Sequence, residues 1–330
     1  MQPSSKPRST VFNALTIDVE DYFQVYGFSR VIRYEDWNRF ECRVERNVNH
    51  LLEILNGSPH HSTLSAPPSP KGTFFILGWI AERYPQLVKR IQKEGYEIAC
   101  HGYSHKLIYT QSREEFRQDV RKAKAILEDI TGREVIGYRA PSFSITSKTL
   151  WALRIIAEEG FRYDSSIFPI NHDFYGMPDA PRFPFLCSQN GNGHFKFELL
   201  HDLKERQKPT HDIAMSQSSM GNGQSIKEFP LSTLRLGNFN LPVSGGGYFR
   251  LFPYPLIKKG FKEINEKDGK PFIFYLHPWE LDPDQPKIDG LSLRSRMRHY
   301  INLEKTEGKL RKLLSDFRFS NIRAIFDETL

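Results

Sequence analysis

The sequence predicts an α/β fold in which parallel strands are linked by crossover helices and form a closed or nearly closed barrel. Short apolar runs typical of buried strands alternate along the chain with segments whose apolar residues recur at helical spacing. Polar and ionisable residues follow five of the strand-like runs, where α/β sheets place their active sites. The 330 residues are enough for one large α/β domain or two smaller ones.

The elements of this fold are read from apolar patterning and from end signals. Strands are expected at 11–17, 73–77, 96–100, 135–138, 271–276 and 319–326. Helices are expected at 44–55, 79–95, 112–130, 146–159, near 255–264, and at 304–317. The helix over 112–130 has the clearest ends, because Ser112 stands three residues before Glu115 as in a capping box and Gly132 follows it.

The chain is predicted to be one domain with a C-terminal extension. Residues 1–10 are expected to be disordered, residues 11–280 to form the barrel, and residues 281–330 to pack on it as the extension. A Gln-, Ser- and Gly-rich stretch at about 186–227 is expected to be a polar, partly disordered insertion. Residues 58–70 are expected to form a loop.

The composition excludes several classes of protein. Hydrophobic residues make up 39% of the chain and charged residues 26%, which excludes wholesale disorder, collagen and coiled coil. The net charge of +7 is mild and spread out, and the basic residues form no nucleic-acid motif. We find neither a membrane helix nor a secretory signal in the pattern. The widely spaced Cys42, Cys100 and Cys187 predict no disulfide framework and favour a reducing, cytoplasmic location.

The first motif with chemical content is an acidic cluster after the first strand. In extended backbone Asp18 and Glu20 share one face, whereas Asp21 turns into the following loop. Acids this close repel one another, so a cation or a proton must offset their charge. Taken alone, such a motif is more often a solvated acidic loop.

The second motif is a pair of histidines after the strand at 96–100. Histidines four residues apart, such as His101 and His105, can aim both imidazoles at one divalent metal. Together with one carboxylate they would leave a fourth position for water, as in catalytic zinc sites. The alternative is two surface histidines.

Three more ionisable residues follow strand-like runs. Arg139 could orient a carboxylate of the acidic cluster by a bidentate pair, or it could be a surface arginine before a turn. Asp164 is by default a helix N-cap. His277, beside a proline turn, could be a general acid or a buried structural histidine. The recurrence of such residues at five strand ends favours one shared site.

These five motifs, in this order, resemble the sequence blocks of the polysaccharide deacetylase family, the NodB-homology domain, whose members remove N-acetyl or O-acetyl groups from sugars. The counterparts are TIDVED, HGYSH, RAPSF, YDSS and YLHPW, between Thr16 and Trp279. The chain is most similar to the exosortase-associated branch, whose C-terminal extension would here begin after about Phe229. The resemblance implies a distorted (β/α) barrel that holds one divalent metal, with zinc first and cobalt, nickel or iron as alternatives.

The resemblance also implies the metal ligands. His101 and His105 would ligate the metal together with one carboxylate. The commonest family form has two adjacent aspartates, whereas here a valine follows the first acid, so the metal carboxylate would be Glu20 or Asp21. The period-two geometry of a strand favours Glu20, while a turn of the loop could bring in Asp21 instead.

The remaining roles are carried over in the same way. Asp18 would be the general base that activates the attacking water, and Arg139 would orient it. His277 would protonate the leaving amine, and Asp164 would tune His277. Amide hydrolysis needs such an acid because an amine leaves poorly unless it is protonated.

The implied function is metal-dependent removal of N-acetyl groups from an amino sugar of an exopolysaccharide or its lipid-linked precursor. One alternative is an amidohydrolase acting on a small cyclic amide, and another is a non-catalytic glycan-binding member of the fold. The implied partner is an N-acetylated glycan, with no nucleic acid, and the sequence predicts no oligomeric state.

Two surface features bear on binding. The aromatic residues expected to stack on sugar rings, with core packing as the alternative, are Tyr22, Phe143, Tyr248 and Trp279. The basic helix at 305–318 could touch anionic lipid at the inner membrane face, although a solvated helix face is the better explanation.

Overall fold

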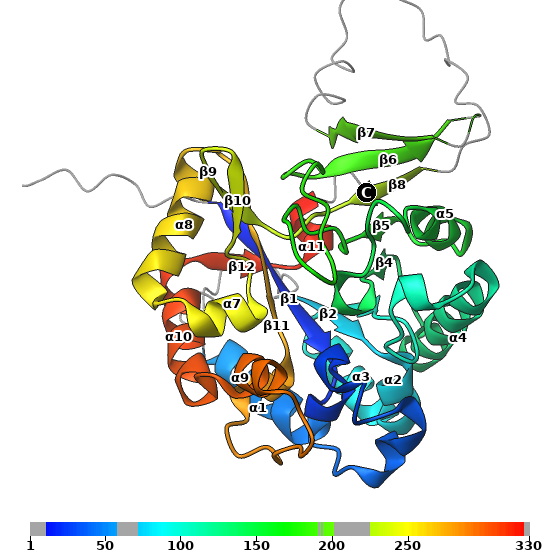
Figure 1. The fold of residues 1–330 in the computed structure, drawn as a ribbon, viewed down its shortest axis with the longest axis vertical. Helices are drawn as coiled ribbons and strands as arrows, with labels where there is room; N and C mark the ends of the chain where they lie inside the picture. The colour runs from blue at the N-terminus through cyan, green and yellow to red at the C-terminus, as the bar shows by residue number, and fades with distance from the viewer. Residues whose placement is uncertain (1–10, 58–71, 191, 193, 201–224, 327–330) are drawn as a thin grey trace, which may run out of the picture.

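The structure, a computed structural model, describes residues 11–57, 72–190, 192, 194–200 and 225–326. Three expectations fall wholly or mainly outside the described residues: disorder at 1–10, the loop at 58–70, and the insertion at about 186–227, of which the structure does not describe 191, 193 and 201–224. Figure 1 shows one central sheet with helices packed around it.

The centre of the fold is a ten-stranded sheet. Nine strands form one path, in the spatial order β11 (Ile273–Leu276), β1 (Phe12–Val19), β2 (Thr73–Ile76), β3 (Glu97–Cys100), β4 (Gly137–Tyr138), β5 (Tyr163–Asp164), β8 (Ser225–Glu228), β6 (Phe185–Gln189) and β7 (Phe195–Leu199). The tenth, β12 (Arg318–Ser320), pairs with β1. Every pairing from β11 through β8 is parallel, which confirms the predicted α/β class. In the described part of the chain no pairing joins β11 to β7, so the sheet path is open there.

Strand β1 pairs with three other strands of the sheet. After its first residue it is buried along its whole length, as a near-continuous apolar run in a parallel sheet should be. It pairs with β11 over Ala14 to Ile17, with β2 over Thr16 to Val19, and with β12 over Phe12 to Ala14. The C-terminal region therefore contributes a strand to the same sheet that the N-terminal region begins.

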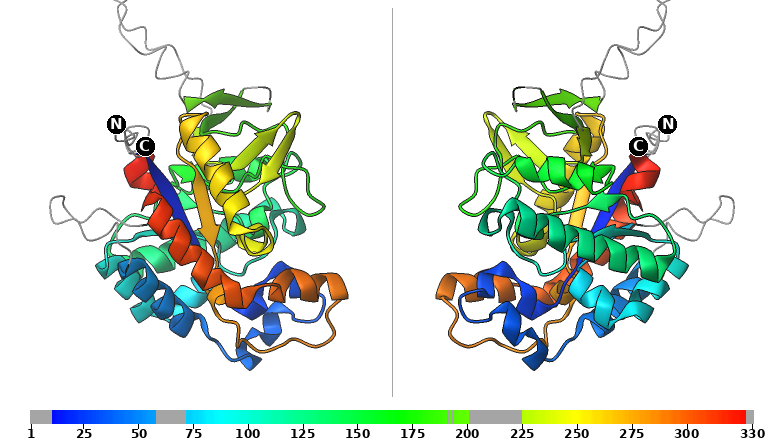
Figure 2. Two further views of the ribbon diagram at one scale, coloured as in Figure 1. Left: turned by 90° about the vertical axis from the view of Figure 1, so that its left-hand side faces the viewer. Right: turned by 90° about the vertical axis from the view of Figure 1, so that its right-hand side faces the viewer.

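The helices connect and cover these strands. They are α1 (Val44–Asn56), α2 (Gly78–Arg83), α3 (Pro85–Lys93), α4 (Arg113–Thr131), α5 (Trp151–Glu158), α7 (Gly246–Leu251), α8 (Tyr254–Glu266), α9 (Leu293–Tyr300), α10 (Leu303–Asp316) and α11 (Ile322–Phe326). Figure 2 shows α10, in orange-red, running alongside the blue strand β1. The predicted capping box of α4 is confirmed: Ser112 Oγ accepts from Glu115 N, and Glu115 Oε2 accepts from Ser112 N at 2.7 Å. None of the helices described is both long and apolar enough to cross a membrane.

The single helix predicted over 79–95 is wrong, because the structure divides it into α2 and α3. Pro85 stands at the first position of α3, where its missing N–H costs nothing. The ring of a proline excludes the preceding residue from helical backbone, and Tyr84 has φ −125° and ψ 56°. The apolar spacing is helical on both sides of this break.

Two further expectations are corrected at the ends of the sheet. Part of the supposed insertion forms an antiparallel hairpin, in which β6 pairs with β7 over Phe185 to Gln189. The strand predicted over 319–326 stops at Ser320, and α11 follows it. Asn321 Oδ1 accepts from Ala324 N at 2.6 Å, which caps that helix.

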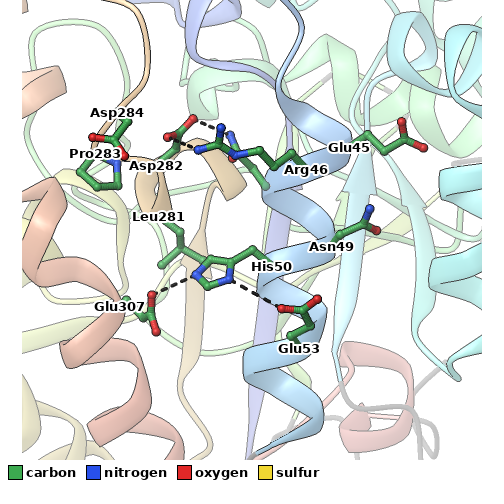
Figure 3. Close-up of a pocket in the computed structure, with 11 residues that line it drawn as sticks. Glu45, Arg46, Asn49, His50, Glu53, Leu281, Asp282, Pro283, Asp284 and Glu307 are labelled. Atoms are coloured by element: carbon green, nitrogen blue, oxygen red, sulfur yellow. Dashed lines mark hydrogen bonds and ion pairs between the residues drawn. The ribbon is translucent and has the colours of Figure 1, made fainter.

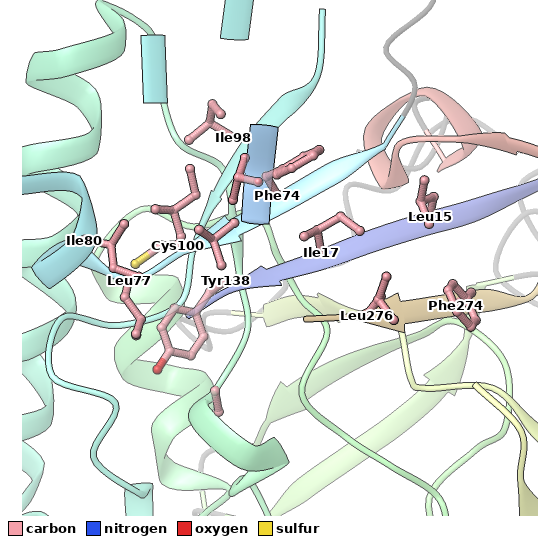
Figure 4. Close-up of a cluster of buried hydrophobic side chains, with 14 of the residues drawn as sticks. Leu15, Ile17, Phe74, Leu77, Ile80, Ile98, Cys100, Tyr138, Phe274 and Leu276 are labelled. Carbon is pink, nitrogen blue, oxygen red and sulfur yellow. The ribbon is translucent and has the colours of Figure 1, made fainter. Parts of the chain in front are cut away.

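The main core lies between the sheet and the helices that follow β2 and β3. Figure 4 shows part of this core, with side chains contributed by β1, β2, β3, β4, β11 and the start of α2: Leu15, Ile17, Phe74, Leu77, Ile80, Ile98, Cys100, Tyr138, Phe274 and Leu276. This layer fixes the positions at which the strands end, and those ends carry the ionisable residues.

A glycine allows α7 to begin directly against β11. Gly245 has φ +143° and bridges to Tyr275, and a Cβ atom there would lie 1.9 Å from the carbonyl oxygen of Tyr275. We expect Gly245→Ala to lower the free energy of unfolding by about 3 kcal/mol or more, from backbone strain and overpacking. Urea unfolding would measure this, with Gly27→Ala as the matched control because a Cβ at Gly27 meets nothing within 4 Å. Equal stability of the two variants would contradict the prediction.

Candidate active site

The carboxyl ends of neighbouring parallel strands bring the ionisable motifs to one edge of the sheet. Asp18 and Glu20 stand at the end of β1, and His277 directly follows β11, the partner of β1. His101 directly follows β3, and Arg139 directly follows β4. Such an edge is where parallel sheets of this class place their sites.

Glu20, His101 and His105 form a compact buried group. Their ligand atoms all lie within 4.8 Å of one another. Glu20 Oε2 lies 2.7 Å from His105 Nε2, and the two imidazole centroids are 5.4 Å apart. His101 Nδ1 is 2.8 Å from the carbonyl oxygen of Arg139, a contact that orients the ring and directs Nε2 to the group.

The donor set and its electrostatics fit a divalent metal. Burial lowers the pKa of His101 to about 4, so its imidazole is neutral, the form that ligates a metal. Burial alone would raise the pKa of Glu20, but the neighbouring His105 and His277 lower it overall. Among the described residues, buried Glu20 Oε2 and His105 Nδ1 have no aligned hydrogen-bond partner. A buried carboxylate oxygen whose close neighbours are imidazole nitrogens is a donor set that a cation would satisfy.

Asp21 is not part of this group, which corrects its interpretation as a metal carboxylate. It is the N-cap of the 3₁₀ helix η1 (Tyr22–Gln24). Its Oδ1 accepts from the backbone N–H of Tyr22 at 2.8 Å, and its Oδ2 from those of Arg43 at 2.5 Å and Val44 at 2.8 Å. Both oxygens are therefore occupied by backbone donors, and Glu20 is the acid beside the histidines.

The predicted contact between Arg139 and Asp18 is present. Arg139 is fully buried, and its Nη1 donates to Asp18 Oδ1 at 2.7 Å and to Thr16 Oγ1 at 2.8 Å. The pair is single rather than bidentate, because Nε and Nη2 bond instead to the carbonyl and hydroxyl oxygens of Ser165, each at 2.9 Å. Asp18 Oδ2 is left facing His277 Nε2 at 4.0 Å.

His277 stands on the other side of Asp18 and is held by a carboxylate that the sequence interpretation missed. Its Nδ1 lies 2.7 Å from Glu280 Oε1, and its Nε2 lies 3.3 Å from Glu20 Oε1. Burial lowers the pKa of His277, but Glu20, Glu280 and Asp18 outweigh it and raise the pKa to about 9. The ring is therefore protonated at neutral pH in this arrangement.

The resemblance assigns the tuning of His277 to Asp164, and the contact between His277 and Glu280 corrects that assignment. Asp164 lies in β5, accepts from Ser166 Oγ at 2.6 Å and is the register partner of Glu228. Glu280 takes its place at the histidine. A glutamate three residues after His277 has capping-box spacing, and Glu280 Oε1 does accept from His277 N at 3.0 Å, so this spacing was the available signal.

Comparison with known proteins identifies this arrangement. Residues 69–162 match the model of the polysaccharide deacetylase family. The chain contains a polysaccharide deacetylase domain. Residues 201–327 match a second model, described as a domain of unknown function (DUF3473).

Two relatives with curated names are also described as deacetylases or deacetylase-like. The chain is 37% identical over 121 residues to a peptidoglycan deacetylase-like protein of Gibberella zeae. This alignment covers 36% of this chain and 32% of that protein. It is 39% identical over 83 residues to a peptidoglycan-N-acetylglucosamine deacetylase of Bacillus cereus. That alignment covers 25% of this chain and 30% of that protein. The chain thus spans about a third of the length of these relatives.

A solved structure supports the fold. A crystal structure from Mycobacterium smegmatis, described as a polysaccharide deacetylase, aligns with a TM-score of 0.54 and 18% identity. The alignment covers 99% of this chain and 93% of that chain. The similarity therefore supports the α/β fold of this chain.

The candidate site of the deacetylase domain draws on both matched segments. The two histidines of the metal group and Arg139 lie within the deacetylase match. His277 and Glu280 lie within the match of unknown function, and the acids of β1 precede both. The second segment therefore completes the site with the residues around His277.

Burial corrects the expected sugar-stacking role of three aromatic residues. The exposed fractions are 1% for Tyr22, 6% for Phe143 and 3% for Trp279, which leaves no ring face for a sugar. Trp279 instead donates from Nε1 to Glu20 Oε1 at 3.3 Å, so it supports the metal group. Tyr248 is half-buried, and its contact with a sugar stays a prediction.

A polar groove of about 730 Å³ lies away from the metal group, between α1, residues 281–284 and Glu307 of α10 (Figure 3). Within it Arg46 Nη2 donates to Asp282 Oδ1 at 3.1 Å. His50 Nε2 lies 2.9 Å from Glu307 Oε2, on the opposite wall. These contacts tie α1 to the C-terminal region on the outside of the deacetylase domain.

Asp164 and Glu228 form a buried acid pair. Among the described residues, no donor from outside this pair forms a hydrogen bond to Asp164 Oδ2 or Glu228 Oε2. Burial raises the pKa of Asp164, and burial together with the charge of Asp164 raises that of Glu228 well above 4.5. The raised pKa of Glu228 favours its protonated form beside Asp164.

We expect Glu228→Gln to become more stable relative to the parent protein as pH rises. The folded-state pKa of Glu228 is raised, so its contribution to stability is complete below the unfolded pKa and is lost as pH rises through the folded pKa. This loss has a limiting slope of about 1.4 kcal/mol per pH unit, whereas the glutamine amide donates to Asp164 at every pH. Urea unfolding from pH 5 to pH 9 would measure it. A constant difference between the two proteins across that range would contradict the expectation.

Proposed function

We propose that this chain is a metal-dependent deacetylase that hydrolyses the N-acetyl group of an amino sugar in an exopolysaccharide or its lipid-linked precursor. The observation that carries the proposal is the buried group of Glu20 and two histidines, beside a carboxylate held by arginine and a histidine held by Glu280. The curated relatives named as peptidoglycan deacetylases support a glycan substrate.

The metal would be held by Glu20, His101 and His105. Zinc suits two imidazoles and a carboxylate, and cobalt, nickel or iron are the alternatives. When bound, a divalent metal polarises a carbonyl group and lowers the pKa of water toward about 7.

Asp18 is the proposed base. Its Oδ2 takes a proton from the attacking water as the new C–O bond forms at the acetyl carbon. Arg139 holds Oδ1 at 2.7 Å, which fixes the direction of the carboxylate.

His277 is the proposed acid. Its Nε2–H donates a proton to the amide nitrogen as the C–N bond breaks, which yields acetate and the free amine of the sugar. Glu280 holds the opposite ring nitrogen and stabilises the protonated imidazole before the transfer.

The test is acetate release from N-acetylated oligosaccharides by the purified protein. Release is measured before chelation, after chelation and after metal is added back, beside His101→Ala. His194→Ala is the matched control, because His194 is exposed and far along the chain from the site motifs. We expect acetate release to stop on chelation and to return when metal is added. It should be absent in His101→Ala and unchanged in His194→Ala.

Other outcomes assign other functions. Bound metal without acetate from any acetylated glycan would favour an amidohydrolase acting on a small cyclic amide. Neither metal nor acetate would overturn the catalytic proposal and favour a non-catalytic glycan-binding protein.

The setting is also part of the proposal. Cys42, Cys100 and Cys187 are unpaired thiols, which suits the reducing cytoplasm. Association of the basic residues at 305–318 with the inner membrane face, and membership of the exosortase-associated branch, stay predictions.

A further inference from the structure

A buried arginine lies behind the proposed acid, in the segment that matches the domain of unknown function. Arg250, in α7, is 2% exposed, and a guanidinium so buried is costly unless it is paired. Its Nε donates to Glu280 Oε2 at 2.6 Å. The other oxygen of that carboxylate, Oε1, holds His277 Nδ1 at 2.7 Å. Arg250, Glu280 and His277 therefore form one continuous chain of contacts.

The remaining donors of Arg250 anchor it to the backbone. Nη1 donates to the carbonyl oxygens of His299 at 2.6 Å and Ile301 at 3.1 Å, and Nη2 to that of Arg298 at 3.0 Å. These carbonyls belong to the C-terminal end of α9, where helix carbonyls lack partners within the helix. The planar fork of arginine satisfies them and the carboxylate together, which the single ammonium of lysine cannot do.

The same end of α9 also restrains the acid through a stack of rings. The centroid of His299 lies 4.2 Å from that of Trp279, at an interplanar angle of 13°. Trp279 in turn stacks on His277 at 5.2 Å and 24°. The imidazole of His277 is thus fixed in plane by the rings and in rotation by Glu280.

Packing against β11 and a contact from α10 fix the position of Arg250. Gly245 and Gly246 let α7 start against Tyr275 of β11, where any side chain would collide. Lys309 Nζ, from α10, donates to the carbonyl oxygens of Arg250 at 2.7 Å and Phe252 at 2.9 Å, which holds the end of α7. Glu280 and the end of α9 therefore meet at the guanidinium of Arg250, while α10 holds its backbone.

We propose that Arg250 is a positioning residue for the proton donor: it fixes Glu280 so that His277 presents Nε2 to the substrate. The inference rests on the proposed function of His277 as the acid. It gives the segment of unknown function a defined task, which is to hold the acid of the site in its working orientation.

The test uses Arg250→Lys, Glu280→Gln and the double variant in the full chain with metal bound. We expect Arg250→Lys to lower kcat by about 10- to 100-fold with KM and metal content unchanged, as when a residue that orients a functional histidine is lost. The double variant should have the kcat of Glu280→Gln alone, because Arg250 acts through Glu280. Arg182→Lys is the matched control, since Arg182 also bonds a carboxylate and a backbone carbonyl, Asp268 and Thr233 O.

A spectroscopic measurement separates positioning from stability. The proton NMR signal of His277 Nδ1–H, assigned by its loss in His277→Gln, should shift in Arg250→Lys and stay in place in Arg182→Lys. Arg250→Gln, measured where circular dichroism shows it folded, provides a second variant. An unmoved signal, an unchanged kcat in Arg250→Lys, or additive losses in the double variant would overturn the inference.

The two proposals fail separately. If the parent protein releases no acetate, the proposed function fails, and the NMR signal still decides whether Arg250 orients the ring. If acetate is released and Arg250→Lys changes neither kcat nor the signal, only the positioning inference fails.

Discussion

Replacing Glu20 by glutamine is expected to abolish metal binding and to lower the rate of acetate release by about 10³-fold. Glu20 is the carboxylate in the group with His101 and His105, and an amide of the same shape is a much weaker ligand. A metal ion supplies several kcal/mol of transition-state stabilisation, and each ~1.4 kcal/mol is tenfold in rate, which gives this order of magnitude. Metal content by mass spectrometry and acetate release under saturating metal measure the two effects.

Asp21→Asn is the matched control for this prediction. Asp21 is adjacent in sequence but accepts from backbone N–H groups of η1 and α1. We expect this variant to keep its metal and its rate, and to lose about 1 kcal/mol of stability from the weakened cap. Loss of metal from Asp21→Asn with retention in Glu20→Gln would reverse the assignment of the ligand.

Asp18→Asn is expected to lower kcat by about 10²- to 10⁴-fold while the metal stays bound, because a general base contributes that much. Asparagine keeps the oxygen that Arg139 Nη1 contacts, so the fold around this buried arginine is preserved. The amide nitrogen cannot take up the proton of water. Single-turnover acetate release and metal content, measured on the same sample, test the prediction.

The control for Asp18→Asn is Asp268→Asn, the same change at another aspartate paired with an arginine, since Asp268 Oδ2 lies 3.1 Å from Arg182 Nη2. It should leave kcat unchanged. Activity in Asp18→Asn close to that of the parent protein would exclude Asp18 as the base and direct attention to Glu20.

The strands and the residues at their ends could be predicted because their signals are local. The apolar run before Asp18 predicts a buried strand, and period-two alternation places Glu20 on the same face. Parallel pairing then brings the ends of neighbouring strands together without further information. The partner of His277 could not be predicted in this way. The capping-box spacing of Glu280 was a separate local signal for that contact. The anchoring of Glu280 by Arg250 had no such signal, because it depends on how α7 and α9 dock.

The hairpin of β6 and β7 shows a different reason for failure. Its composition is polar on average, and that average predicts an insertion. Phe185 and Cys187 nevertheless alternate with more exposed residues, and Phe195 and Phe197 follow the same period. Asn-Gly-Asn-Gly between two such runs is a signal for a hairpin turn. The alternation was therefore present, and the regional composition concealed it.

The pairing of β12 with β1 has a consequence for the order in which the protein can acquire its site. The acids of β1 are synthesised long before β12, and the backbone of Phe12 to Ala14 finds one of its partners only when residues 318–320 have been synthesised. Contacts across so long a separation form slowly, and a strand with unpaired backbone groups attracts strands of other chains. Nascent chains interrupted within α10 should therefore depend on chaperones until β12 is available to pair with β1.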